Sequence, residues 1–510
     1  MVMRPMIFPT PPLARAGLAR RVRARHRATR RLARRARGVA PRARARVMSR
    51  RGVRPTSGVI MRRVGAIAPA TTRVALRALK RRRCLAPRRA STRARGDAVS
   101  DAREGDDDSD ARRLRNGGGD ETFRERVARG QLWLAPLTKG GNAPFRRLCA
   151  SEFGAEVVVS EMAFARFLAK GARVERARVR RHEGDAGDCF GAQIATNAIE
   201  EGVNAALIAS GEFGADFVDL NCGCPIHETW KRGLGAALLK KPAKLERLVE
   251  GIASRIDVPL TVKIRLGIDS SSQARRIAEG LENAGASAVV VHGRTKEQRY
   301  TKAADYDVIR DIVRERNIPI IGNGDVLTWY DARDRMEHSG VAAMMVGRGA
   351  LIKPWIFKEY RERKCWNPTV EQRVGVYYTL RNYMREGFGD DELGKRRFDE
   401  FFPWHLGFFC RYRPLPEDVF GGRPLDDPLL QSRLGFAVDG EVEDDLPIIE
   451  RLLRCESEDA HLAISEVLWS ADSVGDAMDK LETIAKASLE GWRAQVAAGD
   501  RGAHTDTIRG

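Results

Sequence analysis

The stretch PLTVKIRLGIDSSSQARRIAEGLENAGASAVVVH, residues 259–292, contains a complete β-α-β unit. Its two ends, PLTVKI (259–264) and SAVVVH (287–292), are short continuous apolar runs, which are typical of parallel strands covered on both faces. The segment between them, SQARRIAEGLENAG (272–285), has the pattern of a helix and ends in a glycine, where a helix C-cap is expected. The unit therefore predicts a strand, a covering helix and a second parallel strand.

Six further apolar runs continue this pattern on both sides of the unit. A doubly wound sheet would have about five to seven strands and a Gly-rich turn after the first, but LAPLTKGGN (134–142) lacks the G-x-G-x-x-G pattern. Eight β-α units instead predict a TIM (β/α)8 barrel. The eight predicted strands are LWLAPL (132–137), EVVVS (156–160), FGAQI (190–194), DFVDLN (216–221), PLTVKI (259–264), SAVVVH (287–292), IPIIG (318–322) and AAMMV (342–346).

The positive charge of the chain is concentrated in residues 1–96, which contain 29 Arg, one Lys and no Asp or Glu. The whole chain carries +22, of which +30 lies in this leader, so the remaining residues carry a net charge of −8. An Arg-rich leader without acidic residues is typical of organelle transit peptides, and we expect import into a chloroplast or mitochondrion. The alternatives are a retained basic arm or a gene-model extension, with the protein in the cytoplasm or nucleus.

Four further segments are expected after the leader. Residues 97–125 are acidic, Gly-rich and poor in apolar residues, which predicts a disordered linker. The barrel is expected over 126–365, a helical C-terminal domain over 366–490 and a disordered tail over 491–510. The eight cysteines are scattered without paired C-x2-C motifs, so neither disulfides nor a metal site is expected. No stretch after the leader reaches 18 apolar residues, so we expect no membrane association.

Polar residues stand at seven of the predicted strand ends. Catalytic groups of TIM barrels lie on the loops that follow the carboxyl ends of the strands, so seven such ends in order predict a pocket. The residues are Pro136, Leu137 and Thr138; Gln193; Asn221 with Cys224; Lys263 with Arg265; His292 with Arg294; Asn323, Gly324 and Asp325; and Gly347 with Arg348.

The last two of these loops predict a site for a phosphate-bearing cofactor such as FMN. Glycines let backbone N–H groups approach an anion, and Arg348 adds a charged fork. Lys263 and His292 lie on mid-barrel strands, where they could hydrogen-bond a flavin ring and favour negative charge near its N1 atom. Each feature also has a purely structural explanation: Lys263 as a core ion-pair partner, His292 as a satisfied buried histidine, and the Gly-rich segments as ordinary turns.

With these motifs in order, the sequence resembles the tRNA-dihydrouridine synthase family. The resemblance covers about 131–365 and continues more weakly to about 480. Segments such as PLTKGGNAPFRRLC (136–149), FFCRYRP (408–414) and AISEVL (463–468) are most similar to the eukaryotic branch that acts on uridine 47 of tRNA. The motifs that carry the family resemblance are NCGCP (221–225), KRGLGAALL (231–239), VKIRLGI (262–268), VVVHGRTKEQRYTKAADYDVI (289–309), IPIIGNGDV (318–326) and VGRGALIKPWIF (346–357).

The resemblance implies reduction of the C5–C6 bond of a tRNA uridine, with hydride from reduced FMN and NADPH or NADH as electron source. Cys224 matches the general acid that protonates C5, a role that suits a thiol because an ordinary thiol is mostly protonated at pH 7. Residues 366–490 are then expected to bind tRNA, and the protein to act as a monomer. The residues matching cofactor-contacting positions are Pro136, Leu137, Thr138, Gln193, Asn221, Lys263, His292, Asn323, Gly324, Asp325, Gly347 and Arg348.

Three basic residues are expected to contact the tRNA. Lys231 and Arg232 lie on a Gly-rich loop after Cys224 and could clamp phosphates around an extruded base, and Arg294 lies beyond a strand end. A solvated basic turn is the alternative for the first two.

The sequence departs from the family in several ways. Cys222 stands where relatives carry an apolar residue, CCCH zinc fingers are lacking, and the acidic body requires any basic patch to be local. Two other functions therefore stay open. One is an FMN barrel that reduces a free pyrimidine, as dihydroorotate dehydrogenases act, although the KRGLGAALL loop and the helical domain disfavour it. The other is a non-catalytic tRNA-binding flavoprotein, which the retention of Cys224 disfavours.

Overall fold

The computed structural model describes residues 122–181, 189–431 and 443–500. The chain divides into two units, Met1–Val99 and Ser100–Gly510, and all described residues belong to the second. The predicted transit peptide (1–96) therefore lies outside the described residues.

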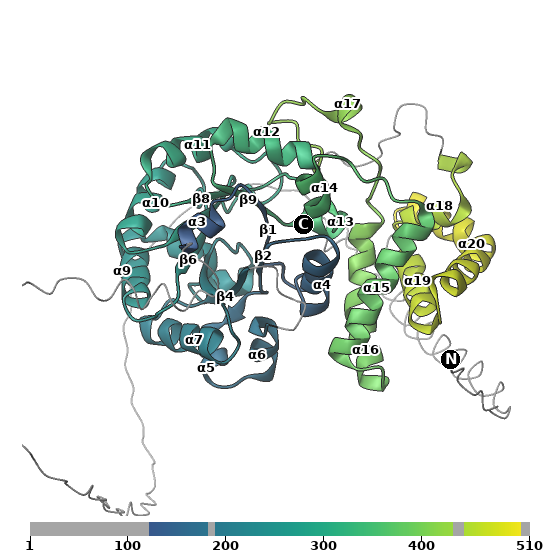
Figure 1. Cartoon of the computed structure of the whole chain (residues 1–510), viewed down its shortest axis with the longest axis horizontal. Helices are drawn as coiled ribbons and strands as arrows, with labels where there is room; N and C mark the ends of the chain where they lie inside the picture. Colours follow the sequence, from purple (N-terminus) through teal and green to yellow (C-terminus); the bar gives the residue numbers. More distant parts are fainter. Residues whose placement is uncertain (1–121, 182–188, 432–442, 501–510) are drawn as a thin grey trace, which may run out of the picture. The chain divides into compact units, whose positions relative to one another are not determined.

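Nine parallel strands form one sheet in which eight strands close into a barrel (Figure 1). The strands follow each other around the ring in chain order, β1 pairs with β9, and the pairing of β2 with β4 completes the circle. Short β3 (Ala163–Phe164) adds to the edge of β4. The predicted TIM barrel is confirmed. Its strands are β1 (Leu132–Leu134), β2 (Val157–Val159), β4 (Cys189–Ala195), β5 (Phe217–Cys222), β6 (Leu260–Arg265), β7 (Ala288–His292), β8 (Ile320–Asn323) and β9 (Ala343–Val346).

Helices surround the strands and bury the outer faces of the barrel, as Figure 1 shows for α7, α9, α10, α11 and α12. Helix α10 begins at Ala274 and ends at Asn283, within the helical segment predicted from the sequence. The helices between β1 and the C-terminal helical region are α4 (Ala143–Arg147), the π-helix η1 (Leu148–Glu152), α5 (Ala165–Ala169), α6 (Arg173–Val179), α7 (Ile199–Gly211), α8 (His227–Lys231), the 3-10 helix η2 (Gly235–Lys240), α9 (Pro242–Ala253), α10 (Ala274–Asn283), α11 (Tyr306–Glu315), α12 (Trp329–Ser339), α13 (Arg348–Ile352) and α14 (Ile356–Glu362).

Two aromatic side chains, Trp133 and Phe217, pack among smaller apolar side chains in the interior of the barrel. The ring of Phe217 lies 5.7 Å from that of Trp133, and Gly191 makes room for it, because a Cβ there would lie 2.2 Å from the Phe217 ring. Helix α3 (Phe123–Val127) adds Phe123, whose ring lies 5.3 Å from that of Phe217. The predicted linker boundary at 125 is therefore wrong, since α3 begins at 123 and is held by a capping box at Thr122.

The helical region predicted after the barrel is present. Helix α16 contains Pro403 in its interior. The Arg147 guanidinium of α4 lies 3.8 Å from the ring centroid of Tyr383 on α15, and this contact joins α15 to the barrel. The predicted tail is wrong for 491–497, because α20 continues to Ala497. No helix within the described ranges is long and apolar enough to cross a bilayer. The helices are α15 (Val370–Phe388), α16 (Glu392–Phe409), α17 (Glu417–Phe420), the 3-10 helix η3 (Glu443–Asp445), α18 (Ile448–Arg454), α19 (Glu458–Ser470) and α20 (Val474–Ala497).

Candidate active site

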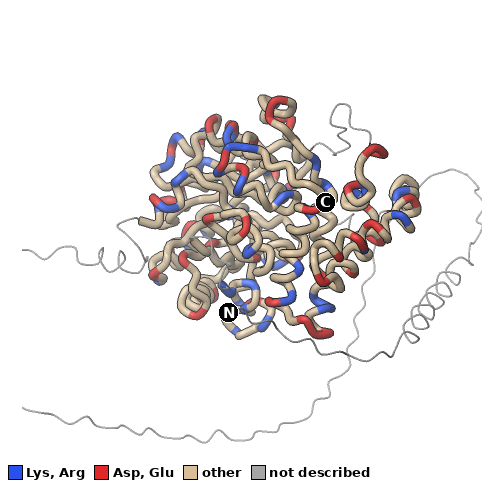
Figure 2. Tube along the Cα trace, turned by 45° about the vertical axis from the view of Figure 1, so that its right-hand side comes forward, with Lys and Arg blue, Asp and Glu red and all other residues tan. Residues whose placement is uncertain are grey.

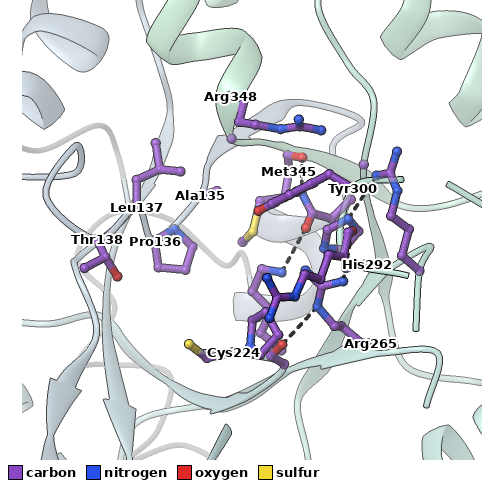
Figure 3. Close-up of a pocket in the computed structure, with 18 of the residues that line it drawn as sticks. Ala135, Pro136, Leu137, Thr138, Cys224, Arg265, His292, Tyr300, Met345 and Arg348 are labelled. Atoms are coloured by element: carbon purple, nitrogen blue, oxygen red, sulfur yellow. Dashed lines mark hydrogen bonds between the residues drawn. The ribbon is translucent and has the colours of Figure 1, made fainter. Parts of the chain in front are cut away.

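A cavity of about 530 Å³ opens at the carboxyl ends of the barrel strands. This volume lies in the range of sites for small molecules and cofactors. Cys224 and all twelve residues predicted to contact the cofactor line it. In Figure 3, Cys224 and Arg348 lie on opposite sides of the opening, with Pro136, Leu137 and Thr138 along one flank. The structure thus brings together residues that are spread over more than 200 positions of the sequence.

The charges that line the cavity are strongly unbalanced. Five of the lining residues are basic, and the one acidic residue among them is Asp325. The guanidinium of Arg348 lies 3.9 Å from the ring centroid of Tyr300 and 3.6 Å from Asp325. Such an excess of positive charge favours an anionic ligand, because an anion offsets the cost of holding several cations together. The basic residues are Lys263, Arg265, Arg294, Arg299 and Arg348.

Glycines bring the loops after β8 and β9 together. A Cβ on Gly349 would lie 2.0 Å from the carbonyl oxygen of Val326, so the two loops could not approach so closely with a larger residue. Gly324 has a φ of +132°, which disfavours any side chain. Gly347 lines the cavity beside Arg348, where a backbone N–H and a guanidinium suit a phosphate group. The residues present therefore fit the phosphate end of a cofactor such as FMN.

Lys263 and His292 carry their hydrogen-bonding groups into the cavity wall. The Lys263 ammonium donates to Asn323 Oδ1 at 2.8 Å, and burial together with the nearby Arg265 lowers the pKa of Lys263 to about 8. Burial and the surrounding cations hold the pKa of His292 well below its usual value, so its ring is neutral at pH 7. Arg294 lies 3.2 Å from His292 Nε2 and can only donate, so Nε2 accepts and Nδ1 carries the proton. Both residues line the cavity, where an ammonium and a neutral imidazole suit a flavin ring.

Asn221 holds the turn that carries Cys224. Its Oδ1 accepts hydrogen bonds from the backbone N–H of Cys224 at 3.0 Å and of Gly223 at 3.3 Å. The Arg265 guanidinium donates to the Gly223 carbonyl at 3.0 Å and ties the turn to the next strand. Cys224 is partly exposed and Cys222 is buried; both are free thiols. The turn therefore presents one of its two sulfurs to the cavity and packs the other in the barrel wall.

The structure places Arg294 in a buried ion pair and not at the surface, where a contact with tRNA was expected. Its side chain exposes 0% of its surface and donates to both carboxylate oxygens of Asp325. A buried and paired guanidinium cannot reach a phosphate at the surface. Lys231 and Arg232 are exposed, but neither lines the cavity, and Arg232 pairs with Glu228. Their contact with tRNA stays a prediction.

Several residues at the cavity were not predicted from the sequence. Trp404 and Phe408 of α16 line it, and so does Leu430, which follows α17. Gly140 lets the indole pack against the loop after β1, since a Cβ there would lie 2.6 Å from Trp404. The aromatic run FFPWHLGFF (401–409) was the available signal, but it indicated only an apolar helix face.

A basic and aromatic cluster lies beyond the Cys224 turn. The Trp230 indole on α8 has the Lys240 ammonium 4.1 Å and the Lys296 ammonium 4.3 Å from its ring centroid. The two lysines come from segments that follow different strands, so their convergence could not be seen in the sequence.

Within the described ranges, no set of His, Cys, Asp and Glu is arranged to hold a metal ion.

The closed parallel barrel, with a cationic cavity at the carboxyl ends of its strands, places this chain among the TIM-barrel proteins, which bind their ligands at that end of the barrel. Residues 133–386 match the family model described as Dihydrouridine synthase (Dus). This part of the chain belongs to the dihydrouridine synthase family.

Two of the similar relatives carry names that include a tRNA position. The chain is 40% identical over 289 residues to the human "tRNA-dihydrouridine(47) synthase [NAD(P)(+)]-like", covering 56% of this chain and 44% of the relative. It is 39% identical over 305 residues to the "tRNA-dihydrouridine(47) synthase [NAD(P)(+)]" of Coprinopsis cinerea, with the same two shares. The chain thus spans less than half the length of these relatives.

Among solved structures, that of histamine dehydrogenase from Rhizobium sp. 4-9 is similar over 50% of this chain and 49% of its own, with 13% identity and a TM-score of 0.34.

Proposed function

We propose that this chain is a flavin-dependent tRNA-dihydrouridine synthase. The single observation that carries the proposal is the position of Cys224, a partly exposed thiol on the rim of a cavity, across the opening from Arg348 (Figure 3). The cationic end of the cavity suits the phosphate of a redox cofactor, and the thiol at the other edge suits a reaction that needs a proton. The membership of residues 133–386 in the dihydrouridine synthase family supports the same function.

The residues of this chain divide the chemistry between them. FMN, when bound, would supply the hydride for C6 of a uracil. Cys224 Sγ holds the proton that C5 must then receive, and Asn221 keeps the thiol at the rim by holding the backbone of its turn. Lys263 and the neutral His292 favour negative charge on the cofactor ring, as their place in the cavity wall supports. Arg348, Gly347 and Gly324 are the proposed phosphate site.

A uridine within folded tRNA must leave its stack to reach this cavity. Figure 2 shows Lys and Arg interspersed with Asp and Glu along the described chain, so an RNA surface has to be local. The cluster of Trp230, Lys240 and Lys296 next to the Cys224 turn is a suitable place, since lysines bind phosphates as point charges. We also propose residues 366–490 as part of the tRNA-binding surface, because Trp404 and Phe408 bring that region to the cavity.

Uridine 47 is the proposed target, and NADPH or NADH the proposed reductant. Both follow from the names of the human and fungal relatives, which specify position 47 and NAD(P)(+).

The test uses the purified full chain. We expect the absorbance spectrum of a bound flavin, and dihydrouridine at position 47 when undermodified tRNA and NADPH are supplied. The lack of bound flavin would contradict the cofactor proposal, and dihydrouridine at another position would contradict the assignment to 47. Reduction of free uracil but not tRNA would favour the free-pyrimidine reductase. Tight tRNA binding with flavin bound but no reduction would favour the non-catalytic flavoprotein.

A further inference from the structure

Asp219 is a buried carboxylate that the proposed reaction does not use. It lies on β5, two residues before Asn221, and exposes 1% of its surface. In the barrel register it is opposite Gln193 of β4 on one side and Thr261 of β6 on the other. Both neighbours donate to it: Gln193 Nε2 at 2.7 Å and Thr261 Oγ1 at 2.6 Å. Burying a carboxylate is costly, so its place beneath the active site calls for an explanation.

A continuous chain of hydrogen bonds leads from Asp219 to Cys224. Gln193 donates to Asp219 and accepts at Oε1 from Asn221 Nδ2 at 2.8 Å. Asn221 in turn accepts at Oδ1 from the backbone N–H of Cys224 at 3.0 Å. Gln193 and Asn221 expose 1% and 8% of their surfaces, so water has little access to replace these bonds.

The direction of every bond in this chain follows from Asp219. An ionised carboxylate can only accept, so it turns the NH2 group of Gln193 toward itself and leaves Oε1 for Asn221. That oxygen turns the NH2 group of Asn221 toward Gln193, which leaves Asn221 Oδ1 for the Cys224 N–H. With Gln193 alone reversed, its NH2 group would face the NH2 group of Asn221; with Asn221 alone reversed, its NH2 group would face the backbone N–H of Cys224. Burial raises the pKa of Asp219 to about 6, which leaves it ionised at neutral pH.

We propose that Asp219 is a positioning residue: through Gln193 and Asn221 it fixes the orientation of two side-chain amides and so holds the Cys224 turn in the geometry that delivers the proton. The catalytic part of this inference rests on the proposed function, whereas the structural part concerns the turn alone.

The first test measures the turn without cofactor or tRNA. Hydrogen–deuterium exchange of peptides containing Gly223 and Cys224 is compared between the wild-type full chain and Asp219→Asn. An amide at 219 no longer has to accept from Gln193, so we expect these backbone N–H groups to exchange at least about tenfold faster, as a bond weakened by 1.4 kcal/mol would allow. Thr261→Val is the matched control, because it removes the other donor to Asp219 and leaves the amide chain intact; its exchange at the turn should equal that of the wild type.

The second test is a double-mutant cycle with Asn221→Ala, which removes the acceptor of the turn directly. If Asp219 acts only through Asn221, Asp219→Asn should add nothing to the exchange rate in the Asn221→Ala background. Thermal unfolding of each variant separates the effect on the turn from a general loss of stability, and Asn221→Ala alone still tests the last bond if Asp219→Asn does not fold.

The catalytic consequence is measured in two half-reactions. Reduction of bound flavin by NADPH needs no proton from Cys224, whereas reoxidation by tRNA does. We expect Asp219→Asn to slow reoxidation by about 10- to 100-fold, the effect of a small misplacement, and reduction by no more than about threefold. The proposal would be overturned if Asp219→Asn left hydrogen exchange at the turn unchanged, or if Thr261→Val raised that exchange equally. It would also be overturned if the effects of Asp219→Asn and Asn221→Ala on exchange were additive. If exchange changes as expected but the full chain forms no dihydrouridine, the proposed function fails while the positioning role stands.

Discussion

The guanidinium of Arg294 donates hydrogen bonds to both oxygens of the Asp325 carboxylate, and the two side chains expose 0% and 1% of their surfaces. The second carboxylate oxygen also accepts from the Ala304 backbone N–H at 2.7 Å. Together these bonds join the loops after β7 and β8 at the wall of the cavity, which both side chains line. Asp325 has a φ of +51°, so its backbone is also held in a conformation that is uncommon for residues other than glycine.

Replacing Asp325 with alanine should lower the free energy of unfolding by about 3–5 kcal/mol, because it leaves the Arg294 charge buried without its partner. Urea denaturation followed by circular dichroism measures this change. The control is Glu200→Ala, which removes the partner of Arg255 in a pair whose side chains are 42% and 75% exposed and should cost less than about 1 kcal/mol. Equal effects of the two variants would show that the buried pair does not hold the loops.

The sequence predicted the barrel because its signals are local. Each strand is a short apolar run, and polar residues such as Gln193, Lys263 and His292 stand at or near a strand end, which the parallel barrel gathers at one rim. The first strand ends earlier than its apolar run, at Leu134, just before Pro136, which has no N–H to donate to a neighbouring strand. Fold and cavity therefore followed from patterns of a few residues.

Pairings between distant segments could not be predicted in this way. Arg294 follows a strand end like the other polar residues, but its partner Asp325 lies 31 positions later and makes it a buried cation. Trp404 and Leu430 reach the cavity from beyond the barrel, and neither carries a charge or motif that marks a site. Such contacts depend on tertiary packing and not on local periodicity.

The Gly-rich loop after Cys224 should be sensitive to a single added methyl group. Gly235 has a φ of +60°, and a Cβ there would lie 2.7 Å from the Cys224 carbonyl oxygen. Gly233 has a similar φ of +71°, but a Cβ there would meet a side-chain nitrogen of Asn197 at 3.2 Å. Both alanine variants should lose about 1–2 kcal/mol through backbone strain. Only Gly235→Ala should also slow flavin reoxidation by tRNA, by about tenfold or more, because it displaces the Cys224 backbone.

Stopped-flow absorbance with tRNA in excess separates the two variants. If Gly233→Ala slows reoxidation as much as Gly235→Ala, the effect comes from loop strain and not from the position of Cys224.

The affinity for FMN should fall as the pH rises above about 8. The pKa of Lys263 is lowered to about 8 without a ligand, mainly by burial, so the ammonium loses its proton above this pH. An anionic ligand favours the charged form, so binding takes up a proton there and weakens by up to about tenfold per pH unit. Fluorescence titration of FMN into the apoprotein between pH 7 and 9 measures the affinity. This pH range lies above the one in which a phosphate group titrates. Lys263→Met should bind more weakly and without this slope; an identical slope would assign the proton to another group.

The basic cluster should contribute to tRNA affinity through phosphate contacts. Lys240→Ala and Lys296→Ala are each expected to weaken binding and to reduce the slope of log K against log salt by about one. Filter binding of tRNA between about 50 and 200 mM salt provides the slope. Arg275→Ala on α10 is the control, since that side chain is 58% exposed and pairs with Glu315 on the outer wall of the barrel. Unchanged slopes in both lysine variants would place the RNA elsewhere.

The most direct measurement of the central claim is anaerobic stopped-flow absorbance of the Cys224→Ala variant with bound flavin. Because an alanine holds no proton for C5, reoxidation of the reduced flavin by undermodified tRNA should slow by about 100-fold or more, while flavin content and reduction by NADPH stay within about threefold of the wild type. Reoxidation by tRNA at the wild-type rate would contradict the account, because Cys224 would then not be the acid.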